Sequence, residues 1–189
     1  MGKNRILFLV GGALAVLLAA AIAMFNVRPS VESVPEAGPE QQDEVPAGEG
    51  EMSVKVYFPD GTRVRMETRT MERVFSQKKI LKGALQEFLK GVPDAERNII
   101  PEGSILLGVY MGNDGVAYIN FSEDFKRNFH GDVQEEYLLL RAVYETAVSN
   151  VNVEDVKILI DNKETDSVGG HFESDRPLKH LVRRDTQSE

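Results

Sequence analysis

The pattern of apolar and polar positions divides the chain into segments of different character, beginning with an uncharged apolar run at residues 6–25. Twenty helical residues span roughly the 30 Å hydrocarbon core of a bilayer, so we expect a transmembrane helix here. Lys3 and Arg5 precede the run, and positive residues favour the cytoplasmic side. Residues 1–5 are therefore expected in the cytoplasm and the rest of the chain outside it. A signal peptide cleaved near Ala21-Ile22-Ala23 is the alternative.

An acidic, proline-rich stretch follows at residues 26–51. It holds one Arg and seven acidic residues, a net charge of −6, and no aromatic residue. Such a composition buries too little apolar surface to offset the entropy lost on ordering. We therefore expect a disordered linker with a reach of about 25 to 30 Å. The chain has no cysteine, which excludes a disulfide and a lipid attached through cysteine.

Residues 52–183 are expected to form one domain, followed by a polar tail at 184–189. Apolar and polar residues first alternate with the period of a strand at 54–58, and Pro59-Asp60-Gly61 supplies a turn into a second strand. In that second strand we expect Val64 and Met66 to face the core. The charged side chains should then face away from it: Arg63, Arg65, Glu67 and Arg69.

The later apolar positions predict two helices and three more strands. Helical spacing begins after Ser76 and ends near Gly91, and it returns from Val133 to about Ser149 with Asp132 as a cap. The buried face of the second helix is expected at Tyr137, Leu140, Tyr144 and Val148. The remaining strands are expected at residues 104–111, 116–121 and 156–160, the first two joined by the turn at 112–115. The order ββαββαβ predicts an α+β fold with one mixed sheet covered by two helices.

Several short motifs, taken in order, resemble the GerM domain family of bacterial sporulation and germination proteins. They are Tyr57-Phe58-Pro59-Asp60, Glu67-Thr68-Arg69, residues 84–91, Ile100-Pro101-Glu102-Gly103, residues 114–122, residues 156–161, and Gly169-Gly170-His171 followed by Pro177-Leu178. The resemblance implies an exported, membrane-tethered, non-catalytic domain of envelope assemblies, with a fold related to ring-building motifs. It also implies that Gly169, Gly170 and His171 form a motif turn. Gly91-Val92 and Asp161-Asn162 depart from the Gly-Pro and Asp-Gly of the family.

We expect no enzyme and no cofactor. Without cysteine a nucleophile would have to be Ser or Thr. Ser104 lacks the spacing of a nucleophile elbow, and Ser122 follows a strand where a helix or turn cap suits it. No two histidines share the spacing of a metal-binding helix, so no metal is expected. An extended segment offering His171, Glu173 and Asp175 as ligands is the alternative.

A cluster of basic residues is the candidate partner surface: Arg63, Arg65, Arg69, Arg73, Lys78, Lys79 and Lys82. One interpretation is a solvated charged face that protects an edge strand from unwanted pairing. The other is a docking surface for an acidic partner or for anionic lipid headgroups.

These features lead to two hypotheses about function. The first is a single-pass protein of the bacterial cytoplasmic membrane whose outer domain assembles with envelope proteins or with copies of itself. The second is a module that binds cell-wall glycan or peptide. The aromatic residues available to floor a glycan groove are Tyr57, Tyr110, Tyr118, Phe121 and Phe129. The acidic, exported character of the chain argues against nucleic acid as a partner.

Overall fold

The computed structural model describes residues 50–94 and 98–182. The predicted cytoplasmic tail, the predicted transmembrane helix, nearly all of the predicted linker and the polar tail at 184–189 lie outside these residues. Within the two described ranges, no helix has both the length and the apolar character needed to cross a bilayer.

The first two strands form a hairpin, as the sequence predicts. Strands β1 (Glu51–Asp60) and β2 (Arg63–Glu72) pair antiparallel along their whole length, with Asp60 opposite Arg63. The chain reverses at Gly61, whose φ of 64° lies in the left-handed region that glycine adopts without steric cost. The hairpin forms a two-stranded sheet of its own, so the expectation of one sheet in the domain is wrong.

The remaining strands form a mixed four-stranded sheet in the order β3-β4-β5-β6. Its members are β3 (Leu106–Met111), β4 (Val116–Phe121), β5 (Asp155–Ile160) and the short β6 (Lys163–Glu164). β4 and β5 are parallel, and the connection between them contains helix α3 (Asp124–Arg127) and helix α4 (Val133–Val148). The strand β6 and the helices α3 and α5 (Lys179–Val182) were not predicted.

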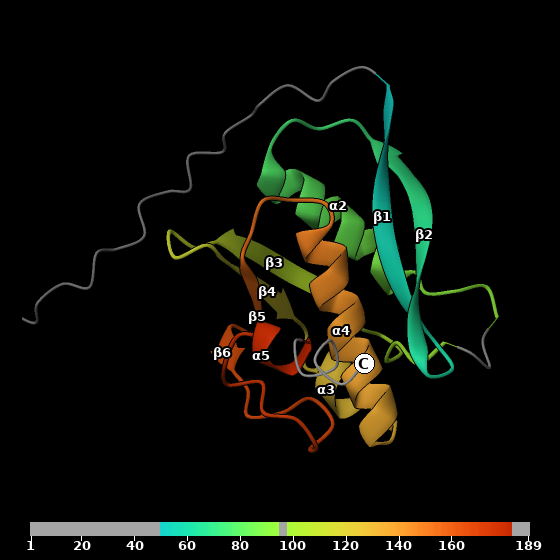
Figure 1. The fold of residues 1–189 in the computed structure, drawn as a ribbon, viewed down its shortest axis with the longest axis vertical. Coiled ribbons are helices and arrows are strands. Elements are labelled where there is room, and N and C mark those ends of the chain that lie inside the picture. The colour runs from blue at the N-terminus through green and yellow to red at the C-terminus, as the bar shows by residue number, and fades with distance from the viewer. Residues whose placement is uncertain (1–49, 95–97, 183–189) are drawn as a thin grey trace, which may run out of the picture. The chain divides into compact units, whose positions relative to one another are not determined.

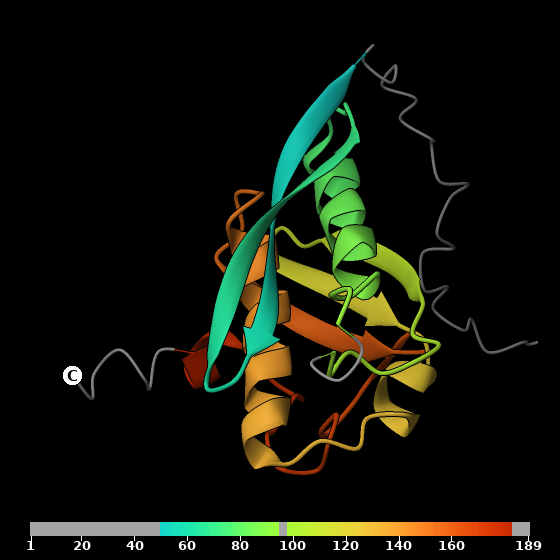
Figure 2. The ribbon, with the colours of Figure 1, turned by 90° about the vertical axis from the view of Figure 1, so that its right-hand side faces the viewer.

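Both predicted helices are present, and they lie between the hairpin and the four-stranded sheet (Figures 1 and 2). Helix α2 (Gln77–Leu89) contacts β1 and β3, whereas α4 contacts β1 and β5. The domain therefore has three layers: hairpin, helix pair and sheet. The helices separate the two sheets, which is why the hairpin does not join the larger one.

Local sequence signals explain the start of α4 and the packing of α2 on the hairpin. The Asp132 carboxylate accepts hydrogen bonds from the backbone N–H groups of Gln134 and Glu135, and the Glu135 side chain accepts from the N–H of Asp132. This capping box satisfies donors that the first turn leaves unpaired. In α2, a Cβ at Gly83 would lie 2.3 Å from the end of the Met71 side chain, so a larger residue there would require Met71 to move.

One apolar core joins the three layers. Val54, Val56 and Phe58 of β1 are buried, and the Phe58 ring stacks on Phe88 of α2 with centroids 5.9 Å apart. On the sheet side, Phe121 stacks on Phe125 of α3 at 4.1 Å. Tight stacking of this kind fixes α3 at the end of β4.

Candidate functional site

The charged residues of β2 lie on the inner face of the hairpin, opposite to the prediction. Val56 pairs with Glu67 and Val54 with Arg69, and side chains that pair directly across antiparallel strands share a face. Both valines are buried, so Glu67 and Arg69 point to the same side as the core. Met66 lies opposite Tyr57 on the other face and is 45% exposed. The expected inner face of β2 is therefore wrong.

Arg69 is held on this inner face by three kinds of contact. Its guanidinium carbon lies 5.0 Å from the centroid of the Phe58 ring. Its Nη2 donates to the Glu67 carboxylate at 2.7 Å and to the backbone oxygen of Gly91 at 3.2 Å. The cation therefore covers an apolar ring while its polar groups are satisfied at the end of α2.

Arg65 continues the same row toward the turn. It forms ion pairs with Asp60 and Glu67 at 3.3 and 2.7 Å and lines a pocket of about 170 Å³ beside Val92 and Pro93. Burial raises the pKa of Glu67, but the hydrogen bonds and charges of Arg69 and Arg65 outweigh it and hold the pKa below its ordinary value. The row is therefore an internally compensated ionic network.

The other predicted basic residues lie at the opposite end of the hairpin. Arg73 donates from its backbone N–H to Gly50 and from its guanidinium to the oxygen of Glu51, where β1 begins. Lys78, Lys79 and Lys82 are exposed on the first turns of α2. The length of β2, about 33 Å for ten residues, separates Arg63 from Arg73. The seven basic residues thus form two groups, and their role as a partner surface stays a prediction.

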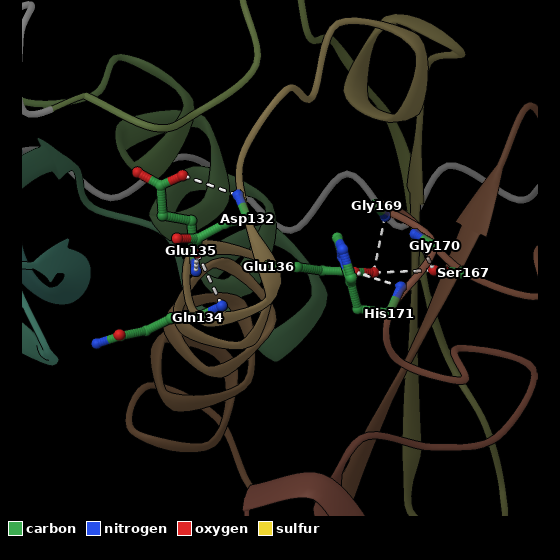
Figure 3. Close-up of polar contacts among 8 residues, drawn as sticks. All are labelled: Asp132, Gln134, Glu135, Glu136, Ser167, Gly169, Gly170 and His171. Atoms are coloured by element: carbon green, nitrogen blue, oxygen red, sulfur yellow. Dashed lines mark hydrogen bonds and ion pairs between the residues drawn. The ribbon is translucent and has the colours of Figure 1, made fainter.

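The predicted motif turn encloses a buried carboxylate (Figure 3). Glu136 of α4 is fully buried, and its Oε1 accepts from the hydroxyl of Ser167 at 2.9 Å and from the N–H of Gly169 at 2.7 Å. Its Oε2 accepts from the N–H of His171 at 2.8 Å and lies 2.9 Å from Nδ1 of the same residue. We call these five side-chain and backbone groups the Glu136 clasp.

Hydrogen bonding determines the charge state of the clasp. Burial raises the pKa of the Glu136 carboxyl, but the donors from Gly169, His171 and Ser167 together outweigh it and hold the pKa below its ordinary value. All four acceptor positions are used, so the carboxylate has no free lone pair aimed at a ligand. The arrangement anchors the segment after β6 to α4 and is not suited to proton transfer.

The two glycines of the motif turn, Gly169 and Gly170, are required for different reasons. A Cβ at Gly169 would lie 2.5 Å from the Phe129 ring and 2.9 Å from the Glu136 carboxylate. Gly170 has open space around it but a φ of 94°, which side chains disfavour. The sequence therefore selects glycine once for close approach and once for backbone conformation.

Family membership follows from a family model, described as "Germane: Sporulation and spore germination", that matches residues 55–166. The chain belongs to this family. The resemblance to the GerM domain is thereby confirmed. No curated protein matches the chain.

Solved structures show that the Germane fold is shared across low sequence identity. A Clostridium perfringens protein described as a "Putative Lipoprotein" has a TM-score of 0.50 at 23% identity, over 70% of this chain and 89% of that one. The tandem GerMN domains of the sporulation protein GerM from Bacillus subtilis have a TM-score of 0.50 at 20% identity, over 68% of this chain. This chain covers 47% of that tandem structure. At these identities the likeness extends to the fold alone.

The Glu136 clasp spans the boundary of the Germane match. Glu136 lies inside residues 55–166, whereas Ser167, Gly169 and His171 follow directly after them. Sequence reasoning missed Glu136 because a carboxylate in the first turn of a helix also favours the helix dipole. The missed signal is its position at the head of a buried stripe that continues through Leu139, Leu140 and Val143. The expected buried face at Tyr137, Tyr144 and Val148 is only half-buried.

The Germane domain does not assemble the alternative metal ligands. His171 contacts Glu136, whereas Glu173 and Asp175 pair with Arg176. Within residues 50–94 and 98–182, no group of three His, Cys, Asp or Glu side chains is placed to hold a metal ion.

The five candidate aromatics also separate. Phe121 and Phe129 are buried, and the hydroxyl of Tyr57 accepts a hydrogen bond from Ser149. Tyr110 and Tyr118 are cross-strand partners on the face of the sheet away from the helices, and Tyr110 is 44% exposed. Two of the five aromatics therefore remain available to a ligand.

Proposed function

We propose that this Germane domain is a non-catalytic, membrane-anchored extracytoplasmic module that assembles with other proteins of the bacterial envelope. Membership of the sporulation and spore germination family supports a role in the bacterial envelope. The apolar run at 6–25, followed by an acidic stretch, supports the membrane anchor and its orientation. Exported domains that work in complexes need a docking surface more than a catalytic pocket.

The observation that carries the proposal is the edge strand β3. It pairs with β4 on one side and ends the order of the four-stranded sheet on the other. Ile105, directly before β3, and Leu107 within it are 58% and 47% exposed. The pairing with β4 is irregular between Leu106 and Gly108, so Leu107 is turned outward. Adjacent exposed apolar side chains on an unpaired edge favour contact with another protein.

A photocrosslinking residue introduced at Leu107 in the full chain tests this proposal in cells. We expect it to capture a specific envelope protein or a second copy of the chain. The matched control is Val133 at the start of α4, which is 51% exposed but lies on another element. Equal capture from both positions, or none from Leu107, would contradict assembly through β3.

Membrane anchorage is tested separately. A reporter active only outside the cytoplasm, fused after Glu189, should be active, and the full-length chain should stay in the membrane fraction. A soluble form that begins near Met24 would show that the apolar run is a cleaved signal.

A cell-wall ligand is the second candidate function, and the neighbouring Tyr110 and Tyr118 favour it. Their rings share the outer face of the sheet, and the hydroxyl of Tyr118 donates a hydrogen bond to the Asp114 carboxylate at 2.9 Å. Rings fixed in this way suit stacking on a sugar. Tyr110→Ala should then reduce sedimentation of the chain with purified cell wall, and Leu107→Asp should not. If instead Leu107→Asp reduces partner capture and Tyr110→Ala does not, assembly through β3 is favoured.

A further inference from the structure

The segment between β2 and α2 exposes an aromatic ring among basic side chains. Phe75 is 63% exposed, the largest exposed fraction of any large apolar side chain in the described residues. Arg73 precedes it and Lys78, Lys79 and Lys82 follow it, all of them exposed. Lys79 and Lys82 are three apart and Lys78 and Lys82 four apart, so the lysines project from adjoining positions on α2. We call these five residues the entry surface.

The entry surface lies where the chain enters the domain. The backbone N–H of Arg73 donates to the backbone oxygen of Gly50 at 3.0 Å, and its guanidinium donates to the backbone oxygen of Glu51 at 3.2 Å. Figure 2 shows that β1 begins at the same end of the domain as α2. If residues 6–25 anchor the chain, the entry surface is the part of the domain attached most directly to the tether.

The charge around Phe75 is positive. Among the described residues, Glu51 and Glu72 bring two carboxylates to this end of the hairpin, where they face each other, beside one arginine and three lysines. The first turn of α2 contains no acidic residue, so its lysines add to the positive end of the helix dipole. Lys78 also lies 5.7 Å from the centroid of Tyr110, which places a second half-exposed aromatic beside the lysines.

We propose that the entry surface docks on anionic phospholipid headgroups, with the Phe75 ring in the membrane interface and the basic side chains around it. Interfacial membrane sites combine Trp, Phe or Leu, buried at the boundary between headgroups and acyl chains, with lysine and arginine on the polar side. The inference rests on the membrane-anchored placement proposed above. Docking would direct α2 and the Tyr110 end of β3 toward the bilayer and leave Ile105 and Leu107 open to a protein partner.

The chain contains no tryptophan, so Phe75→Trp creates a single fluorescent reporter at the surface in question. The full-length variant is reconstituted into vesicles of phosphatidylglycerol and phosphatidylcholine that carry a quencher at the headgroup level. We expect a blue-shifted emission that the quencher reduces, with a loss of quenching in phosphatidylcholine alone. Ile105→Trp is the matched control and should stay unquenched, because Ile105 is 58% exposed directly before β3, at the end of that strand away from Tyr110.

Charge variants test the electrostatic part. Lys78→Glu with Lys79→Glu, in the Phe75→Trp background, should lower the ratio of docked to free domain by about fivefold or more for each lysine, and added salt should act in the same direction. Lys163→Glu, at an exposed lysine in β6, should leave the ratio unchanged.

Flotation of the same vesicles separates the two proposals. Chain that floats while the Phe75→Trp reporter is unquenched would overturn the docking and leave the anchor standing. Chain that does not float would overturn both. Emission that responds to salt but not to lipid composition would show that the acidic residues 26–49 cover the lysines, and would also overturn lipid docking.

Discussion

The side-chain amide of Asn150 pairs with the backbone of Lys55 as a neighbouring strand would. Its Oδ1 accepts from the N–H of Lys55 at 2.9 Å, and its Nδ2 donates to the oxygen of the same residue at 2.6 Å. Thr146, one turn earlier, accepts from the N–H of Tyr57 at 3.0 Å. Residues of α4 and directly after it therefore bind the middle of the edge of β1 that β2 leaves open. The N–H and C=O of Lys55 and the N–H of Tyr57 are not available to another chain.

Asn150→Ala should lower the free energy of unfolding by about 2 to 3 kcal/mol, because it removes bonds to both backbone groups of Lys55 and one to Thr146. Chemical denaturation of the domain from Glu44 onward measures this. Asn150→Asp keeps the acceptor for the N–H of Lys55 but sets a carboxylate oxygen against the carbonyl oxygens of Lys55 and Thr146, so it should cost at least as much. A clearly smaller loss for Asn150→Asp would show that the amide donor contributes nothing.

Glu136→Gln should destabilise the domain by about 3 kcal/mol. The amide oxygen can keep two of the donors, but the new amide nitrogen faces two others that then have no acceptor. Glu135→Gln is the control, since its side chain lies in the exposed capping box and amides also serve there. A loss no larger than that of the control would contradict the clasp.

The clasp also predicts a dependence of stability on pH. The folded-state pKa of Glu136 lies below its ordinary value of 4.5, so its contribution to stability is complete above that value and is lost as the pH falls through the lower folded pKa. The difference in unfolding free energy between the parent and Glu136→Gln should therefore shrink on acidification. Denaturation between about pH 6 and pH 3 tests this, and a constant difference would contradict it.

Alanine at Gly169 and alanine at Gly170 of the motif turn should have distinct effects. Gly169→Ala forces a Cβ against the Phe129 ring and the carboxylate, at a cost of about 1 to 3 kcal/mol, and should weaken the pH dependence. Gly170→Ala meets no atom and should cost about 1 to 2 kcal/mol from its positive φ while the pH dependence persists. Identical pH profiles would show that Gly169 does not position the carboxylate.

Arg69→Met should destabilise the domain by about 1 to 2 kcal/mol. It removes the cation from the Phe58 ring, and it removes the hydrogen-bond donor of the Glu67 carboxylate and of the Gly91 backbone oxygen. Arg63→Met is the control, because Arg63 is exposed beside the turn. The size of the difference can be read from denaturation midpoints. Equally small losses at Arg63 and Arg69 would favour the outward orientation that the sequence predicted for both residues.

Periodicity located most elements of the fold, since helix and strand spacing depends on residues close together in the chain. It failed where the orientation of a strand depends on its register with the partner strand. The apolar Val64 and Met66 indicated an inner face, but the register with β1 places Glu67 and Arg69 there, because the long stem of arginine packs on Phe58.

The candidate site divides in the same way. Gly169, Gly170 and His171 could be selected from a family motif, whereas the carboxylate they enclose comes from a helix more than thirty residues earlier. A burial pattern alone gives no reason to place a charge in the core, because its cost is offset only by donors that the sequence does not show together. The seven basic residues form two groups because the ten-residue strand β2 places Arg63 and Arg73 at opposite ends of the hairpin.

The pairing of Asn150 with Lys55 has a kinetic consequence. The two residues are 95 positions apart, so β1 leaves the ribosome well before the residue that closes its open edge. At synthesis rates of about 5 to 20 residues per second, the edge waits for roughly 5 to 20 s. A two-stranded hairpin is at best marginally stable alone, so the hairpin should be among the last parts of the domain to gain protection from hydrogen exchange. During that interval a chaperone or a second nascent chain has access to β1 that the finished domain denies.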